Sequence, residues 1–174
     1  MQKNFLLLIL ASSMILGPMS GYAQEDAELF NSAKQSIKVG ERDFGFMQFH
    51  SLLRLSISSP YYHDALFATG EYYFASANYF DAYTSFSKFV ELYPRSDALP
   101  FAVVYLLKME QMQAQGSEYD LKKKVITFKQ LSLLFSEYKE YPYNSPMGLK
   151  YKAVYFIDRL EVYINEALFE TVYF

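Results

Sequence analysis

The stretch from His63 to Ser96 constrains the fold more than any other part of the chain. Apolar and small residues recur at helical spacing on both sides of Asn78, and Pro94 closes the stretch. This pattern predicts a hairpin of two antiparallel helices, of a kind that repeats about every 34 residues. Such a hairpin cannot bury its apolar face alone and needs stacked neighbours. The residues that carry the pattern are Leu66, Gly70, Tyr73, Ala82, Phe86 and Pro94.

Hairpins with related spacing flank this stretch. Phe30, Phe67 and Phe101 occupy the same position in three successive units, which indicates a short array. We predict helices over residues 25–39, 43–57, 61–77, 79–93 and 97–115, a sixth from 119 or 120 to 140, and a last one from 146 or 147 to 172. The expected fold is all-α: a tetratricopeptide-repeat-like α-solenoid of about seven helices in stacked antiparallel hairpins, covering residues 24–174.

Residues 1–23 have the pattern of a secretory signal peptide. Lys3 precedes an apolar run over residues 5–16, and Gly21 and Ala23 are small residues before a cleavage point at Gln24. The run is short for a membrane span, and an uncleaved anchor is the alternative. We therefore expect export across the inner membrane. In a Gram-negative source the protein would lie in the periplasm, free or peripheral at the outer membrane.

Composition excludes several classes of function. Hydrophobic residues make up 52% of the chain, which is enough for a sizeable core. The net charge of −3 gives no basic surplus for nucleic acid, and the short run of Lys122, Lys123 and Lys124 is typical of a solvated helix face. The chain has no cysteine. Disulfides, thiol catalysis, cysteine metal sites and a lipid anchor on an N-terminal cysteine are therefore excluded.

The sequence carries no motif that predicts an enzyme or a cofactor. His50 and His63 fall on separate predicted helices, so their spacing does not favour a metal site. Nucleophile-elbow, phosphate-loop and zinc-protease motifs are absent from the sequence. Glu71 and Glu91 are candidate carboxylates, but each is explained by a solvated or groove-facing position. We expect a binding protein without cofactor or metal.

The first helix of each predicted hairpin would line a concave surface. Its outward positions are mostly aromatic with few charges, which suits an extended or helical peptide with aromatic side chains. The alternative is that a terminal helix or self-association covers these rings, because large exposed apolar patches are rare on monomers. The predicted groove residues are Phe30, Lys34, Ile37, Phe67, Glu71, Phe74, Phe101, Tyr105 and Lys108.

Two turns share one composition: Tyr93-Pro94-Arg95-Ser96 and Tyr141-Pro142-Tyr143-Asn144-Ser145. With the segment from Gly70 to Phe74 and the later Asp158-Arg159-Leu160, they give the chain a pattern that resembles the BamD-type proteins. These are periplasmic tetratricopeptide lipoproteins of the outer-membrane β-barrel assembly machinery. Residues 59–96 are also similar to the periplasmic repeat domain of the cell-division coordinator of the Tol–Pal system.

The resemblance implies a non-enzymatic periplasmic scaffold that binds polypeptide partners in outer-membrane protein assembly. Its partners would be outer-membrane proteins or subunits of the assembly machinery. The chain lacks the lipid-bearing cysteine of that family and stops in the helix that would open a fourth repeat. The alternatives are a soluble periplasmic repeat adaptor for Tol–Pal or cell-wall machinery and an unrecognised all-α enzyme. An uncapped last repeat would also allow homo-oligomers.

Overall fold

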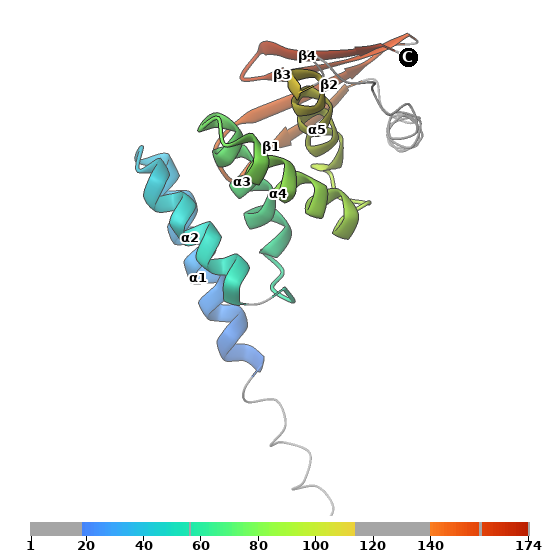
Figure 1. Ribbon diagram of the computed structural model, residues 1–174. Coiled ribbons are helices and arrows are strands. Elements are labelled where there is room, and N and C mark those ends of the chain that lie inside the picture. Colours follow the sequence, from blue (N-terminus) through green and yellow to red (C-terminus); the bar gives the residue numbers. More distant parts are fainter. Residues whose placement is uncertain (1–18, 56, 114–139, 157, 174) are drawn as a thin grey trace, which may run out of the picture.

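The computed structural model describes residues 19–55, 57–113, 140–156 and 158–173. In these residues five helices are followed by four strands (Figure 1). The predicted all-α class is therefore wrong, because the fold is a mixed α/β arrangement in which an antiparallel sheet follows the helices. The alternative of an all-α enzyme loses its structural basis for the same reason.

The first five predicted helices are present. They are α1 (Met19–Lys38), α2 (Arg42–Leu55), α3 (Tyr62–Ala75), α4 (Tyr79–Leu92) and α5 (Leu99–Gln113). Each helix packs on the next one along the chain, so α1 and α2 form one hairpin and α3 and α4 the second. Asn78 caps α4 by accepting a hydrogen bond from the Asp81 amide.

Small residues let the paired helices approach closely. A Cβ atom at Gly70 would lie 2.9 Å from the ring of Phe86, and one at Gly45 would lie 2.5 Å from Ile37. Both contacts are shorter than van der Waals packing allows. Glycine at these two positions therefore lets the paired helices pack closely.

The C-terminal part forms strands where a helix was expected. Its elements are β1 (Glu140–Asn144), β2 (Lys150–Tyr155), β3 (Arg159–Ile164) and β4 (Ala167–Tyr173), paired antiparallel in the order β1-β2-β3-β4. The helix predicted up to residue 172 is therefore wrong, and the predicted turn after Tyr141 is mostly strand. The sixth predicted helix lies outside the described residues, apart from Glu140, which belongs to β1.

Local backbone geometry explains the strands. Leu160, Val162 and Ile164 alternate along β3 on the face toward the helices, as a half-buried strand requires. Asn165 and Glu166 have positive φ values of 48° and 70°, which suit the tight turn that joins β3 to β4. Gly148, with φ of 78°, has the same role between β1 and β2.

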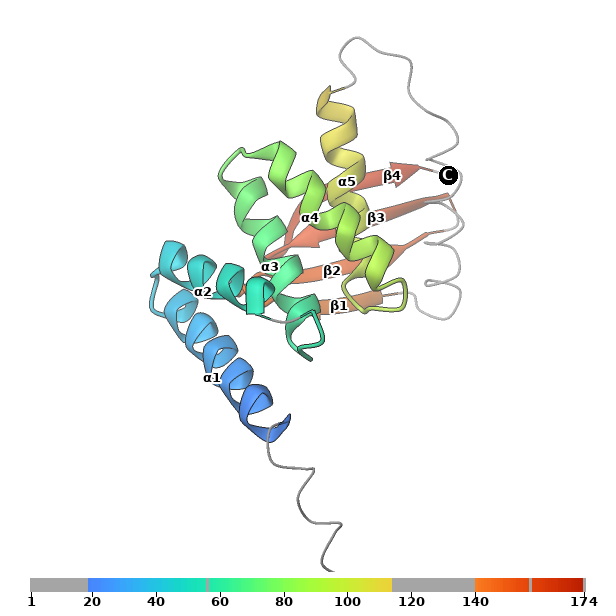
Figure 2. The ribbon, with the colours of Figure 1, turned by 60° about the horizontal axis from the view of Figure 1, so that its bottom comes forward.

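One face of the sheet packs against the helices. Figure 2 shows α3, α4 and α5 in front of one face of the sheet, with α1 and α2 to one side. Tyr151, Ala153, Leu160 and Val162 of the sheet are buried in the same core as the helices. The turn between β1 and β2 inserts Met147 into the smaller core of α1, α2 and α3. The sheet and its first turn thus contact α1, α3 and α5.

The predicted signal peptide lies mostly outside the described residues. Its last part, from Met19, belongs to α1. None of the helices in the described residues is both long enough and apolar enough to cross a bilayer.

Candidate functional site

The aromatic residues at the centre of the predicted groove are core residues. Phe67 and Phe101 are fully buried. The ring centroid of Phe67 lies 5.4 Å from that of Tyr143, and the ring of Phe101 stacks on Tyr143 at 5.7 Å. Both rings also contact Tyr151. Phe67 and Phe101 therefore do lie on the same side of the helices, as predicted, but the protein's own sheet covers that side.

The predicted groove positions on α1 differ in exposure. Phe30 is buried against Phe49 and Tyr61, and Ile37 is half-buried. Lys34 is exposed and lines a surface pocket together with Ile37.

At the other end, Phe74 is half-buried and contacts both Tyr105, which is buried, and Phe169 of β4. The ammonium group of Lys108 lies 3.0 Å from a carboxylate oxygen of Glu170 in β4. The predicted aromatic groove is therefore not an open surface in the part of the chain that the structure describes.

A buried carboxyl group joins the helices to the sheet. Glu71 of α3 is only 2% exposed. The Tyr151 hydroxyl donates a hydrogen bond of 2.5 Å to its Oε1 atom, and the hydroxyls of Tyr105 and Tyr151 are 2.8 Å apart. The Oε2 atom makes no hydrogen bond of ordinary geometry within the described residues, although the Ser145 hydroxyl interacts with the carboxyl group. Three elements, α3, α5 and β2, thus meet at one polar cluster.

Burial raises the pKa of Glu71 to about 8, and the hydrogen bond from Tyr151 offsets only part of that rise. The pKa values of Tyr151 and Tyr105 are raised as well, mainly because burial disfavours the phenolates. At neutral pH the cluster is therefore largely uncharged. Such groups can resemble catalytic residues, but these are enclosed between packed elements, so we assign them a structural role.

An open pocket lies where the second hairpin meets the sheet. Its volume is about 710 Å³. Residues from the start of α3, from the turn between α4 and α5 and from β1 surround it. Both Tyr-Pro segments that carry the family resemblance contribute to it, although they lie far apart in the sequence. The lining residues are His63, Asp64, Leu92, Tyr93, Pro94, Arg95, Ser96, Asp97 and Tyr143.

The pocket combines an apolar wall with a charged rim. The rings of His63 and Tyr93 lie 5.6 Å apart, and Arg95 and Asp97 are exposed. Burial raises the pKa of Asp64, and the nearby His63 and Lys34 oppose that rise. The His63 Nε2 atom lies 3.4 Å from Asp64. Aromatic rings beside side chains of both charges can bind an extended peptide through stacking and hydrogen bonds.

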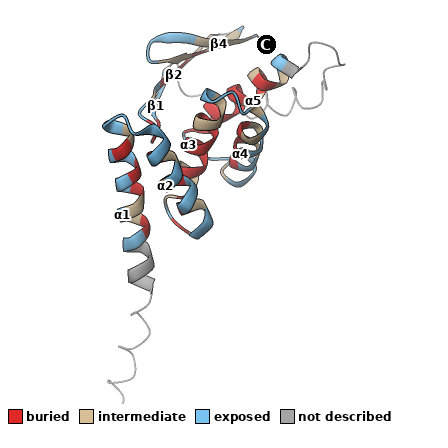
Figure 3. Ribbon diagram, turned by 60° about the vertical axis from the view of Figure 1, so that its left-hand side comes forward, coloured by how far each residue is buried: buried red, intermediate tan, exposed pale blue. Residues whose placement is uncertain are grey.

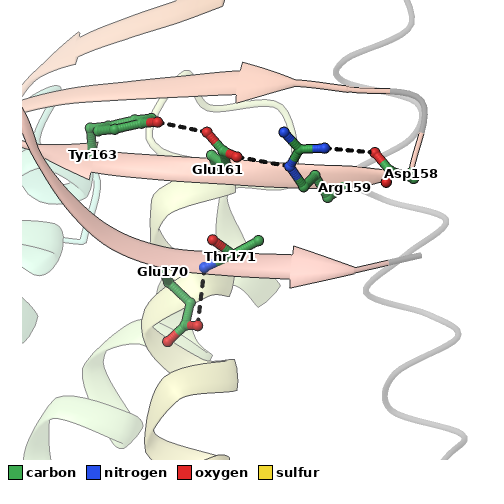
Figure 4. Close-up of polar contacts among 6 residues, drawn as sticks. All are labelled: Asp158, Arg159, Glu161, Tyr163, Glu170 and Thr171. Atoms are coloured by element: carbon green, nitrogen blue, oxygen red, sulfur yellow. Dashed lines mark hydrogen bonds and ion pairs between the residues drawn. The ribbon is translucent and has the colours of Figure 1, made fainter.

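The outer face of the sheet carries a polar ladder (Figure 4). Arg159 donates a hydrogen bond of 2.8 Å to Glu161, and Tyr163 donates one of 2.6 Å to the other oxygen of that carboxylate. These bonds lower the pKa of Glu161, with the larger effect from Tyr163. The three residues satisfy one another on a solvated strand face, so they do not indicate a binding site by themselves.

The edge strand β4 is protected by its own chain. The Glu170 carboxylate accepts a hydrogen bond from the Thr171 amide (Figure 4), and Lys108 donates one to the Phe169 carbonyl oxygen. Bonds of this kind remove backbone groups that could pair with another strand. Strand addition at this edge is therefore disfavoured.

The two histidines lie on different helices. His50 is exposed on α2, whereas His63 lies in the pocket. Among the described residues no cluster of histidine and carboxylate side chains could hold a metal ion.

Sequence reasoning placed Glu71 on the correct face but missed Tyr143 and Tyr151, because it assigned them to a turn and a helix. It also singled out the Tyr93 turn without placing a pocket there. A comparison with protein-family models returns no match for this chain, and a comparison with curated proteins finds no relative.

Proposed function

We propose that the protein is a non-enzymatic periplasmic scaffold that binds polypeptide partners in outer-membrane protein assembly. One observation supports the binding role above the others: the two Tyr-Pro segments converge on one pocket through Tyr93, Pro94 and Tyr143. These segments are also the basis of the resemblance to BamD-type proteins. The other part of that resemblance, a late helix containing Asp158 to Leu160, is replaced by the start of β3.

The pocket favours a peptide that binds through its side chains. It lies beside β1, where Pro142 lacks an amide hydrogen and weakens any added strand. Its aromatic wall offers stacking surface, whereas Arg95 and Asp97 on the rim can pair with polar groups. An extended segment that inserts one aromatic side chain can stack on the aromatic wall and pair with the charged rim.

The Tyr93→Ala variant is expected to weaken peptide binding at least about tenfold, since tyrosines in pockets often dominate binding energy. The probe is a short fluorescent peptide in which aromatic and polar residues alternate, and the measurement is fluorescence anisotropy. Phe80→Ala is the matched control, because Phe80 is 79% exposed and lies outside the pocket. Equal affinity for the two variants, with unchanged melting temperatures, would rule out this pocket as the binding site.

The second candidate function is a soluble adaptor for Tol–Pal or cell-wall machinery. The absence of a lipid-bearing cysteine and the resemblance of residues 59–96 favour it. Affinity purification of the tagged full chain from envelope extracts separates the two functions. We expect subunits of the barrel insertase to be enriched with the wild type and lost with Tyr93→Ala. Enrichment of Tol components or cell-wall synthases, without insertase subunits, would instead establish the adaptor.

A further inference from the structure

Helix α2 carries an apolar stripe on its exposed side. Phe44 is 52% exposed, Met47 61% and Leu55 59%. Together with Ser51 these residues follow one another at steps of three and four, so they lie on one side of the helix. Much of α2 is pale blue in Figure 3, which marks exposed residues. Within the described residues its other sides pack on α1 and α3.

The stripe is more apolar than its sequence suggests. The Ser51 hydroxyl donates a hydrogen bond of 2.9 Å to the Met47 carbonyl oxygen of its own helix, so it needs no further partner. Ser51 is also small and permits a close approach of another helix. A narrow stripe with large residues at both ends and a small one near its middle can pack against a second helix that carries the same pattern of large and small residues.

We infer that α2 is the interface of a symmetric dimer in which two copies of the helix pack antiparallel. A two-fold axis near the middle of α2 places Phe44 beside Leu55 of the second copy and Met47 beside its Ser51. Every large side chain then meets either an apolar partner or the small residue. A two-fold interface requires such self-complementarity.

The charged residues beside the stripe also suit this two-fold axis. Asp43 and Arg54 lie near opposite ends of α2 on one flank of the stripe. The antiparallel arrangement brings each Asp43 toward Arg54 of the second copy, so two ion pairs flank the apolar contact. Arg54 makes no ion pair within the described residues. Asp43 accepts a hydrogen bond from Tyr72 through Oδ1, which leaves Oδ2 for Arg54.

This interface is small. A helix of 14 residues is about 21 Å long, and a contact of that length buries less than the ~1,200 Å² at the lower end of standard interfaces. The dimer should therefore dissociate on dilution. It uses a different surface from the peptide pocket and does not depend on the proposed function.

Sedimentation of the full chain over a concentration series tests the dimer. We expect a monomer–dimer equilibrium that Met47→Lys abolishes, because it places two ammonium groups near the axis. Arg54→Asp should weaken dimerisation several-fold, since it sets like charges together. The double variant with Asp43→Arg and Arg54→Asp should restore dimerisation, because the pair is then reversed but still complementary.

The control is Lys88→Asp, a charge change at an exposed position on α4, which should leave the dimer unchanged. Circular dichroism of each variant verifies that it is folded. A wild-type chain that stays monomeric at every concentration would overturn the inference. So would a dimer that is indifferent to Met47→Lys, or a charge-swapped variant that is no better than Arg54→Asp.

Discussion

Replacing Phe67 and Phe101 together by alanine is expected to unfold the protein. Both side chains are fully buried, and each packs against Tyr143 and Tyr151 of the sheet. Truncating a buried phenylalanine to alanine costs about 3–5 kcal/mol, because contacts are lost and a cavity remains. Two such losses approach the whole stability of an ordinary domain, which is about 5–15 kcal/mol.

Thermal and urea unfolding followed by circular dichroism measure this loss. Each single variant should keep a cooperative transition at lower denaturant concentration, whereas the double variant should show little or no folded baseline. Phe80→Ala removes an exposed ring and should leave the transition in place. If the double variant kept the wild-type transition and lost only peptide binding, the rings would belong to an open groove after all.

Whether Phe67 and Phe101 are core residues or groove residues depends on the sheet, and the sequence predicted the helices but not the sheet. Helices α1 to α5 were predictable because each has apolar residues at steps of three and four. Gly70 and Phe86 belong to the repeat pattern and meet at the close helix contact, and Asn78 is the turn residue between the two helices, where it also caps α4. The side of the helices that carries Phe67 and Phe101 was also predictable, since it follows from the helical period alone.

The sheet was not predictable by the same pattern. Residues 146–172 contain apolar side chains dense enough to satisfy both a helical and a strand period, so periodicity alone does not distinguish the two. The pattern that indicates strands is the alternation of Leu160, Val162 and Ile164, followed by a turn at Asn165 and Glu166. That turn lacks the glycine that usually marks a tight hairpin, so the boundary between β3 and β4 was hidden.

The failure to predict the sheet also led to the wrong prediction of an open groove. The aromatic rings on one side of the helices predict an open groove if no other element is expected to cover them. The burial of Glu71 depends on Tyr151, which lies 80 positions further along the chain. No local pattern links these two residues. The pocket at Tyr93 was missed for the same reason, because Tyr143 reaches it only through the fold of β1.

The burial of Glu71 has a large expected effect of its own: the free energy of unfolding should fall as pH rises from about 4.5 to about 8. The ordinary pKa of the glutamate side chain is 4.5, and burial raises that of Glu71 to about 8 in the folded protein. Between these values the folded state keeps the proton that the unfolded state has released. Stability contributed by this group is therefore complete below the unfolded pKa and decreases toward the folded pKa.

The slope from one such group is at most about 1.4 kcal/mol per pH unit. The Glu71→Gln variant has nearly the same shape but does not titrate, so its stability should lack this slope. We therefore expect the variant to gain stability relative to the wild type as pH increases through this range, with the difference levelling off above about pH 8. Urea unfolding at several pH values measures the difference directly, and other titrating groups cancel between the two proteins.

The Tyr151→Phe variant separates ionisation from packing at this cluster. It keeps the ring but removes the hydroxyl that donates to Glu71, so the carboxyl group loses its main stabilising partner. That loss should raise the pKa of Glu71 further and extend the slope above pH 8, at a cost of about 1–3 kcal/mol. Equal pH dependence in the wild type and Glu71→Gln would mean that Glu71 is not held as a neutral acid between the helices and the sheet.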